Sequence, residues 1–378
     1  MGIGGEIKVA PVGSDVALQE FLRLPWSIYR ADPYWVPPIL AHQQEFLDKK
    51  RGPFFEIGEA EYFLAYLGGR PAGRISAHVN HLHDEHHGPE TGFFGFFESV
   101  PDQRVVAALF EAAMAWLQAR GKTRLQGPLN FGIYDEMGLL VEGFDSMPAL
   151  FQTHNPPYYE ELLTNLNFRK AFDWHAYKIT NRDVDLAAME RFVDRILQGQ
   201  KVVLRHLIPG EMEQRAKEVF DLFNRAWNPI WGHVPLTWGQ FRYLMESVKP
   251  LIRPQLAHLV LDNDRLVGFG LALPDLNPLV KKLDGRLTLW GKLRLLYEAK
   301  YGPIRKIRAM VVGIGQQYQL RKLHQAMILR SYIYLVKNTQ CQMADLSLIP
   351  ENLHHWIKVL LAFGAQRYKV FRVFEREI

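Results

Sequence analysis

EYFLAYLGGRPAGRISAHVN (residues 61–80) holds two runs of alternating apolar and polar residues, separated by glycines at 68 and 69. A period of two is typical of strands, so the stretch predicts a β-hairpin. GFFGFFESV (92–100) is aromatic on both faces and indicates a buried central strand, in which Gly95 marks a bulge or a close approach by a ligand. The helical periodicity of residues 105–121 completes the pattern. Together these elements predict an α/β (α+β) fold.

The same order of elements returns in the second half of the chain. HLVLDNDRLVGFGLAL (258–273) predicts a second hairpin that turns at Asn263-Asp264. A strand (307–314), a helix (319–337), a strand (342–348), a helix (351–363) and a closing strand (367–377) follow. We therefore expect two domains of one plan, 1–185 and 186–378, each with a mixed, mostly antiparallel sheet flanked by helices. The second domain carries a basic insert near 275–306.

Composition narrows the class of protein. Hydrophobic residues make up 48% and charged residues 22% of the 378, which is typical of globular chains. The first residues lack the apolar core of a secretion signal, and Cys341 is the single cysteine, so we expect a cytoplasmic protein. A net charge of +5 suits an anionic ligand or an anionic membrane surface.

Several stretches carry a resemblance to a known family. They are DPYWVPP (32–38), GFFGFFES (92–99), GPLNFGIYDEMGLLVEGFDSMP (127–148), HNPPYYEELL (154–163) and the closing PENLHHWIKVLLAFGAQRYKVFRVFERE (350–377). With the order of elements, they resemble a bacterial group of tandem GNAT N-acyltransferases that includes bacterial ceramide synthases. The resemblance implies two GNAT-like domains, acyl-CoA or another acyl thioester as co-substrate, no permanently bound cofactor, and a primary amine as acceptor. Its sharpest form is transfer of a long acyl chain to a sphingoid base.

One departure from the family concerns the donor site. GNAT enzymes usually hold the CoA pyrophosphate on backbone amides of a glycine-containing Q/R-x-x-G-x-G/A loop at a helix start. Here the matching residues 319–324 read QLRKLH, with Lys322 and His324 in place of the glycines. We expect side chains to bind the phosphates instead, and the candidates are Gln319, Arg321, Lys322 and His324. We expect the acyl donor in the C-terminal domain and the acceptor in the N-terminal domain, but the degenerate loops leave open which half of the chain binds the donor.

N-acylation requires a base for the amine proton and an acid or water for the leaving thiolate. Glu98 or His154 is the candidate base, and Tyr158 or Tyr159 is the candidate acid. Polar groups in the loop of residues 127–163 are candidates for substrate binding: Asn130, Tyr134, Asp135, Glu136 and Asn155. The alternative is structural, with residues 155–157 as a helix cap and the tyrosines as packing.

HLHDEHHG (81–88) holds four histidines and two carboxylates but no H-E-x-x-H spacing. We interpret it as a polar loop between strands and expect no functional metal.

The region 280–308 interleaves lysines and arginines with leucines and a tryptophan. Such a stretch favours peripheral contact with the inner membrane surface, and the alternative is a solvated helix packed on its own domain.

Two other functions stay open: a Fem-like transferase that uses aminoacyl-tRNA, and a non-catalytic GNAT-like binding protein. In the acyltransferase interpretation no nucleic acid partner is expected. Acyl chain length, the acceptor and the oligomeric state are undetermined.

Overall fold

The computed structural model describes residues 5–181, 184–208 and 210–378. Contacts divide the chain into two compact units. Unit 1 comprises 1–174, 277–287 and 369–378, and unit 2 comprises 175–276 and 288–368. Residues 182–183, at the start of the expected junction, lie outside the described residues, and a domain boundary at 185 stays a prediction. Across the described ranges, no helix combines the length and the apolar character needed to cross a bilayer.

Unit 1 is built on a mixed sheet in the order β1-β2-β3-β4-β5-β15, with β8 also paired to β15. The pair β4–β5 is parallel, and the pairs β1–β2, β2–β3, β3–β4 and β5–β15 are antiparallel. The strands are β1 (Ile7–Pro11), β2 (Gly58–Leu67), β3 (Arg70–Asn80), β4 (Thr91–Ser99), β5 (Arg124–Gly127), β8 (Leu139–Glu142), part of β9 (Arg169–Thr180) and most of β15 (Gln366–Glu377).

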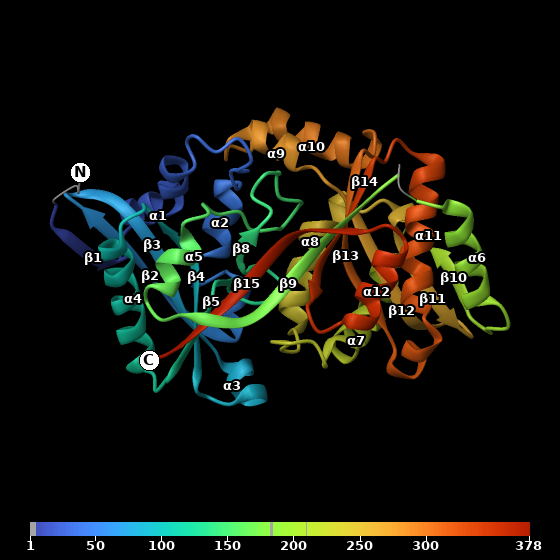
Figure 1. The fold of residues 1–378 in the computed structure, drawn as a ribbon, viewed down its shortest axis with the longest axis horizontal. Coiled ribbons are helices and arrows are strands. Elements are labelled where there is room, and N and C mark those ends of the chain that lie inside the picture. Colours follow the sequence, from blue (N-terminus) through green and yellow to red (C-terminus); the bar gives the residue numbers. More distant parts are fainter. Residues whose placement is uncertain (1–4, 182–183, 209) are drawn as a thin grey trace. The chain divides into compact units, whose positions relative to one another are not determined.

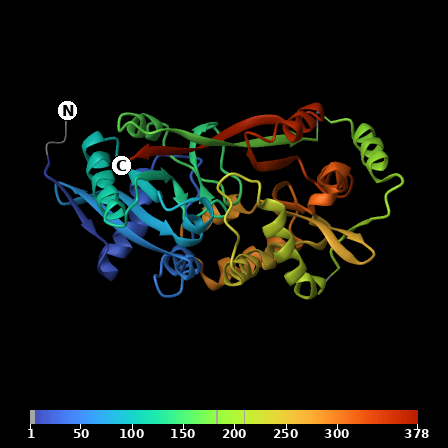
Figure 2. The ribbon, with the colours of Figure 1, turned by 90° about the horizontal axis from the view of Figure 1, so that it is seen from below.

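Helices cover both faces of this sheet. On one face α4 (Gln103–Gln118) packs on β2, whose Phe63 and Ala65 belong to the same buried cluster, and α5 (Tyr159–Thr164) packs on Phe97 of the central strand through Tyr159. On the other face α1 (Asp15–Ile28) packs on Tyr62 and Leu64, because alternate residues of a strand point to opposite sides. Figure 2 shows α4 (teal) and α1 (dark blue) on the two sides of the blue strands. The remaining elements are α2 (Leu40–Phe46), η1 (Pro53–Glu56), α3 (His81–His87), the two-stranded sheet of β6 (Leu129–Asn130) and β7 (Glu136–Met137), and α9 (Asn277–Leu283).

The end of the chain completes the sheet of unit 1. Phe374 to Glu377 of β15 pair with Gly127 to Arg124 of β5 in antiparallel register. Lys369 at the start of this segment is fully buried and donates to the backbone carbonyl oxygens of Gly143 and Ser146. The last ten residues are therefore part of the fold of unit 1, although they follow unit 2 in sequence.

Unit 2 repeats the plan with the strand order β9-β14-β13-β12-β11-β10. The pair β13–β14 is parallel, and the pairs β10–β11, β11–β12 and β12–β13 are antiparallel. The strands are β10 (Val203–His206), β11 (Ala257–Asp262), β12 (Arg265–Pro274), β13 (Lys306–Ile314) and β14 (Met343–Pro350). The helices are α6 (Leu186–Leu197), α7 (Glu211–Trp227), α8 (Trp238–Val248), η2 (Lys249–Leu251), η3 (Pro254–Leu256), α10 (Leu289–Tyr301), η4 (Gln316–Arg321), α11 (Leu323–Asn338) and α12 (His354–Ala362). Figure 1 labels most of these elements.

Both predicted hairpins are confirmed at their turns. Gly68 and Gly69 join β2 to β3, and Asn263 and Asp264 join β11 to β12, and all four residues have positive φ. Two-residue hairpin turns of this kind require left-handed backbone, which glycine, asparagine and aspartate adopt most readily. The expected α/β class, with a mixed and mostly antiparallel sheet flanked by helices, is confirmed in each unit.

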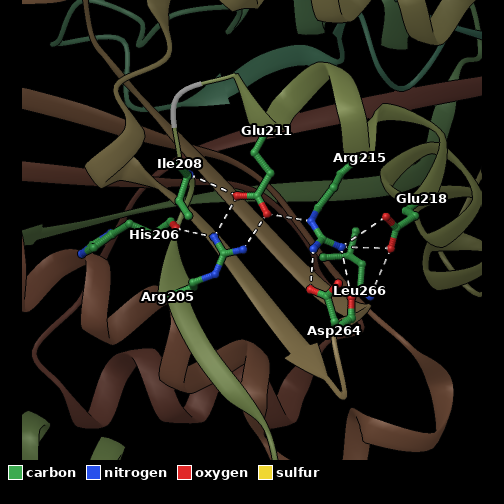
Figure 3. A network of polar contacts seen from close by, with 8 residues as sticks. All are labelled: Arg205, His206, Ile208, Glu211, Arg215, Glu218, Asp264 and Leu266. Carbon is green, nitrogen blue, oxygen red and sulfur yellow. Dashed lines mark hydrogen bonds and ion pairs between the residues drawn. The ribbon is translucent and has the colours of Figure 1, made fainter.

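An ion-pair network ties α7 of unit 2 to the second hairpin (Figure 3). Glu211 accepts hydrogen bonds from Arg205 of β10 and from Arg215 one turn further along α7. Arg215 also bonds Asp264 in the turn, with 2.7 Å between Nη2 and Oδ1. The bonds from Arg205 lower the pKa of Glu211 to about 2 despite its burial. The network holds the start of α7 on the β11–β12 hairpin.

The structure corrects the expectation for residues 81–88. The expected loop is the helix α3, since the Asn80 side chain accepts from the backbone N–H of His83 and Gly88 ends the helix at φ 96°. Lys122 fixes this helix by donating to the Asp84 carboxylate at 2.6 Å. Burial lowers the pKa of His83 to about 3, so this histidine is uncharged near neutral pH. A local cap thus outweighed the polar composition of the stretch.

Candidate functional site

The site in unit 1 starts from a bulge in β4. Ser76 of β3 lies opposite Gly95, but Arg74 lies opposite Glu98, so β4 has one residue more than β3 over this span. Phe96 takes a φ of 48°, and its backbone N–H donates to Asn130 Oδ1 at 2.7 Å. A bulge redirects the side chains that follow it, and the next polar side chain here is Glu98.

Gly95 is explained by a close approach of the chain itself. A Cβ at this position would lie 2.0 Å from the backbone carbonyl oxygen of Leu129 in β6. The parallel pairing of β4 with β5 has ended just before, at Phe93 and Gln126. Beyond that point β6 lies against β4, and Asn130 holds the bulge. The sequence predicted a bulge or a close approach by a ligand at Gly95. The structure shows the bulge beside it, and the group that approaches it closely is the backbone of β6.

Glu98 is the centre of a buried polar cluster. Its Oε2 accepts hydrogen bonds from the hydroxyls of Tyr29, at 2.7 Å, and Tyr159, at 2.8 Å. Its Oε1 lies 3.7 Å from Nη2 of Arg74. Burial raises the pKa of Glu98 to about 7, although the Arg74 charge and the two hydroxyls oppose the shift. A carboxyl group that titrates near neutral pH is suited to both accept and donate a proton.

Arg74 supplies the positive charge of the cluster. Its Nη1 donates to the carbonyl oxygen of Phe21 at 2.7 Å, and its guanidinium lies 5.0 Å from the Phe21 ring centre. Its Nε is buried and has no hydrogen-bond partner within the described part of the chain. Burial lowers the pKa of Arg74, and the charge of Glu98 opposes that shift. Arginine stays charged in proteins, so Arg74 favours the ionised form of Glu98.

His154 forms a second pair beside this cluster. Its Nε2 lies 2.8 Å from Oδ2 of Asp32, whose other oxygen accepts from the backbone N–H of Tyr34 at 2.7 Å. The hydroxyl of Tyr29 lies 3.0 Å from the His154 carbonyl oxygen, so the His154–Asp32 pair adjoins the Glu98 cluster. Burial lowers the pKa of His154, and Asp32 only partly offsets this. The imidazole is therefore neutral and its proton is assigned to Nε2, which leaves Nδ1 as a proton acceptor.

Nδ1 of His154 is buried and has no partner among the residues described. An unpaired buried acceptor costs free energy, so such atoms call for an explanation. One explanation is that Nδ1 accepts a proton from a substrate. His154 therefore remains a candidate base beside Glu98.

The two tyrosines hold the end of β4 in different ways. Tyr159 donates to Glu98 while its oxygen accepts from the backbone N–H of Ser99 at 2.8 Å. Tyr158 instead donates to the Ser99 carbonyl oxygen at 2.8 Å. Burial raises the pKa of Tyr158 to about 12 and raises that of Tyr159 further, so both phenols are protonated at neutral pH. Of Tyr158 and Tyr159, only Tyr159 donates a hydrogen bond to Glu98.

The loop of residues 130–136 lies next to this cluster. Asn130 Nδ2 is 3.4 Å from Glu136 Oε2, and the negative charge of Glu136 contributes to the raised pKa of Glu98. Burial also raises the pKa of Asp135 to about 7, although its Oδ2 accepts from the Gly132 backbone N–H at 3.1 Å. Burial likewise raises the pKa of Tyr134. The carboxyl groups of Asp135 and Glu136 thus lie in a loop beside the Glu98 cluster.

Asn155 is placed differently from the other candidates. Its Oδ1 accepts from the Leu140 N–H at 2.7 Å, and its Nδ2 donates to the carbonyl oxygens of Leu140 and Pro156, each at 3.1 Å. These bonds satisfy the amide within the backbone of β8 and the entry to α5. The Asn155 side chain therefore has a structural role, but not that of the expected helix cap, since the N-cap of α5 is Tyr158, which makes no side-chain cap bond. A substrate contact for Asn155 stays a prediction.

Sequence reasoning missed three residues of this site: Tyr29, Asp32 and Arg74. Asp32 opens DPYWVPP, where it was weighed only as part of the resemblance. Arg74 lies in the part of β3, residues 72–80, that is buried throughout, and it is only 4% exposed. A buried arginine requires a partner, so its position was a usable signal. Tyr29, at the end of α1, carried none.

The donor candidates lie in unit 2, around the start of α11. Gln319 and Arg321 belong to η4, and Lys322 precedes α11 with a φ of 59°. No side chain in the described chain caps the first turn of α11, so its amides are available to an anion. His324 does not supply the expected charge: it packs edge-on against Trp356, and burial lowers its pKa to about 4.

Sequence comparison relates this chain to known proteins. No family model matches the chain. The chain is 30% identical over 378 residues to the "Bacterial ceramide synthase" of Caulobacter vibrioides, covering 99% of this chain and 98% of that protein. It belongs to the family of this bacterial tandem-GNAT protein. The chain is also similar to "Protein YghO" of Escherichia coli, with 29% identity over 366 residues that cover 96% of this chain and 93% of that protein.

Solved structures support the fold of the family. A "Tandem GNAT protein from the clavulanic acid biosynthesis pathway" superposes with a TM-score of 0.58 at 14% identity over 98% of both chains. A "GCN5-related N-Acetyltransferase from Sphaerobacter thermophilus" gives a TM-score of 0.52 at 12% identity, covering 98% of this chain and 95% of that one. At these identities the likeness shows the fold alone. The predicted tandem GNAT fold is confirmed.

Proposed function

We propose that this chain is an N-acyltransferase that moves an acyl group from acyl-CoA, or another acyl thioester, to a primary amine. The observation that carries the proposal is Glu98, a buried carboxyl whose pKa is raised to about 7 and which is held by Tyr29 and Tyr159 in a GNAT-fold unit. A free amine is mostly protonated at neutral pH, so the reaction needs a base of this strength.

The proposed chemistry uses the groups of the cluster in sequence. Ionised Glu98 accepts a proton from the ammonium nitrogen of the acceptor, and the freed lone pair attacks the thioester carbonyl carbon. The new C–N bond forms and the C–S bond breaks, and the thiolate leaves with a proton from Tyr158, Tyr159 or water. The nitrogen gives up its second proton as the amide forms, and this proton replaces the one passed to the thiolate. Arg74 beside Glu98 keeps the carboxylate available by opposing the rise in its pKa. His154, with Asp32 on its Nε2, is the alternative base.

We assign the donor to unit 2. Arg321 and Lys322 provide two cations at the uncapped start of α11, where backbone amides also favour phosphate. In unit 1 the corresponding helix α4 begins at Asp102, whose carboxylate already accepts from the Arg104 N–H at 2.9 Å. A capped, negatively charged helix start disfavours a pyrophosphate. Gln319 is the remaining donor candidate.

The finer proposal is a long-chain donor and a sphingoid base as acceptor. Its support is the family member named as a bacterial ceramide synthase, at 30% identity over almost the full length of both chains. Asn130, Tyr134, Asp135 and Glu136, beside Glu98, are the proposed acceptor contacts.

The test is thiol release from acyl-CoA donors of increasing chain length, each with and without a sphingoid base, a short alkylamine and an amino acid. We expect release that depends on added amine, with the amide product identified by mass spectrometry. Absence of amine-dependent release with every donor and amine would contradict the proposal. Salt-sensitive binding of tRNA in that case would support the Fem-like alternative, and its absence would leave the non-catalytic one.

A further inference from the structure

α10 of unit 2 presents large apolar side chains to solvent. Leu289 is 71% exposed and Trp290 80%, and the other members of this face are likewise exposed. We define the apolar face of α10 as Leu289, Trp290, Leu293, Leu296, Tyr297 and Tyr301. Six such residues on thirteen consecutive positions form a contiguous exposed patch, which is unusual for a surface that contacts only water.

The six side chains share one side of the helix. At 3.6 residues per turn they span an arc of roughly 140° around the helix axis. The opposite side contains the buried residues Gly291 and Ala299 and the half-buried Leu295 and Glu298. The small residues therefore face the body of unit 2, and the large apolar residues point away from it. This is the reverse of an ordinary surface helix, whose apolar stripe faces the core.

Positive charges border the apolar face. On the same projection Lys292 lies just beyond one edge of the arc, Arg294 just beyond the other, and Lys300 within it. All three are exposed, and within the described ranges none forms an ion pair with a carboxylate. The one acid of the helix, Glu298, lies on the inner side, where its charge acts on Arg253. The outer side of α10 is thus apolar and cationic.

Both ends of α10 are fixed to the unit. The Thr288 hydroxyl accepts from the Gly291 backbone N–H at 3.1 Å and caps the first turn. At the other end Arg253 donates to the carbonyl oxygens of Ala299, at 2.7 Å, and Gly302, at 2.6 Å. A cation that bonds the last carbonyl groups stabilises a helix end. The apolar face is therefore held outward on a rigid support.

We propose that the apolar face of α10 docks on an anionic lipid bilayer, with the helix lying in the plane of the interface. Leucines and aromatic rings suit the boundary between headgroups and acyl chains, and lysine and arginine at the edges of the arc pair with anionic headgroups. Charge complementarity favours this occupant over an apolar protein surface, which would leave the bordering cations desolvated without partners. The proposal concerns unit 2 alone and does not depend on the proposed acyl transfer.

The test is flotation of the full-length protein with vesicles of phosphatidylcholine alone, and of phosphatidylcholine mixed with phosphatidylglycerol. We expect binding to the mixed vesicles that weakens as salt is raised, because the attraction to headgroups is screened. The triple variant Leu289→Ser, Trp290→Ser, Leu293→Ser should weaken binding more than about tenfold through loss of apolar burial. The control is Leu361→Ser, which changes another exposed leucine of unit 2, on α12, and should bind as the wild type does.

A second variant keeps the proposal testable if the serine variant does not fold. Reversing the three charges, with Lys292→Glu, Arg294→Glu and Lys300→Glu, keeps the apolar face and should weaken binding to the mixed vesicles about 100-fold or more. Failure of the wild type to float with mixed vesicles would overturn the proposal. Flotation of both α10 variants to the same extent as the wild type would overturn it as well. A change in oligomeric mass on serine substitution, without vesicle binding by the wild type, would assign this face to a second copy of the chain and overturn it too.

Discussion

The central strands of the two units differ where chemistry is expected. β4 and β13 each pair with a hairpin strand on one side and with a parallel strand on the other, and each pairing shifts register at an equivalent place. After the shift, unit 1 has Arg74 opposite Glu98, whereas unit 2 has Gly270 opposite Val312. The same backbone device therefore presents an ion pair in one unit and an apolar pair in the other.

The helices that follow the two central strands differ in the charge at their starts. The start of α4 in unit 1 is occupied by the Asp102 carboxylate, while the start of α11 in unit 2 is flanked by Arg321 and Lys322. Unit 1 thus has groups suited to proton transfer at its central strand, and unit 2 has groups suited to binding an anion at the start of α11.

The first prediction concerns the two central strands. Glu98→Gln should lower kcat by about 100-fold or more, because an amide cannot accept the amine proton. Val312→Thr, at the equivalent place in unit 2, should leave kcat within about twofold, since it removes no titratable group. Steady-state thiol release measures both. A larger loss in the Val312 variant would mean that the roles of the two units are reversed.

The second prediction concerns the two helix starts. Removing both cations, with Arg321→Ala and Lys322→Ala, should raise the KM for acyl-CoA about tenfold with little change in kcat, since phosphate binding is lost equally in both states. Arg104→Ala at the start of α4 is the matched control and should leave this KM unchanged. The opposite ranking would place the donor in unit 1.

The third prediction concerns pH. If ionised Glu98 is the base, kcat/KM should fall as pH drops below about 7, the pKa that burial gives this carboxyl. Arg74 lowers that pKa, so Arg74→Met should move the midpoint upward, by about one pH unit. Tyr29→Phe removes a hydrogen bond that also lowers it and should move the midpoint in the same direction. An unchanged midpoint in both variants would assign the proton transfer to His154 instead.

The fourth prediction compares the stability of the two units. The pKa of Glu98 is raised in the folded state, so its contribution to stability falls as pH rises from about 4.5 through 7. Glu98→Gln removes this loss, so the unfolding free energy of the variant should fall less between pH 4 and pH 8 than that of the wild type, by about 1–3 kcal/mol.

Glu211 in unit 2 behaves in the opposite way. Its folded pKa is about 2, so its stabilisation is complete above the unfolded pKa and is lost as pH falls toward 2. Glu211→Gln should lower the unfolding free energy by about 1–2 kcal/mol near neutral pH, allowing for solvent screening. Chemical denaturation at pH 8 and pH 4 measures both variants. The two substitutions should change the pH dependence of stability in opposite senses, and a change in the same sense would contradict the assigned shifts.

Local patterns predicted most of the fold. The alternation of residues 61–80 and 258–273 and the turn residues Gly68-Gly69 and Asn263-Asp264 predicted both hairpins, and GFFGFFESV predicted the central strand with its interruption at Gly95. These features depend on steric preferences within a few residues, which composition and spacing reveal directly. The wrong prediction of a loop at residues 81–88 also concerns a local feature, because the capping residue Asn80 directly precedes the helix in the sequence.

The chemistry of the site was decided by tertiary structure. The sequence identified Glu98 as a candidate, but its proton affinity depends on burial and on Tyr29, Arg74 and Tyr159, which lie up to 69 residues away in sequence. The placing of residues 369–378 in the sheet of unit 1 likewise rests on pairing with β5, about 250 residues earlier. A pattern in the chain reports what each segment prefers by itself. Electrostatic shifts and long-range pairing depend on which segments meet, and only the folded chain determines that.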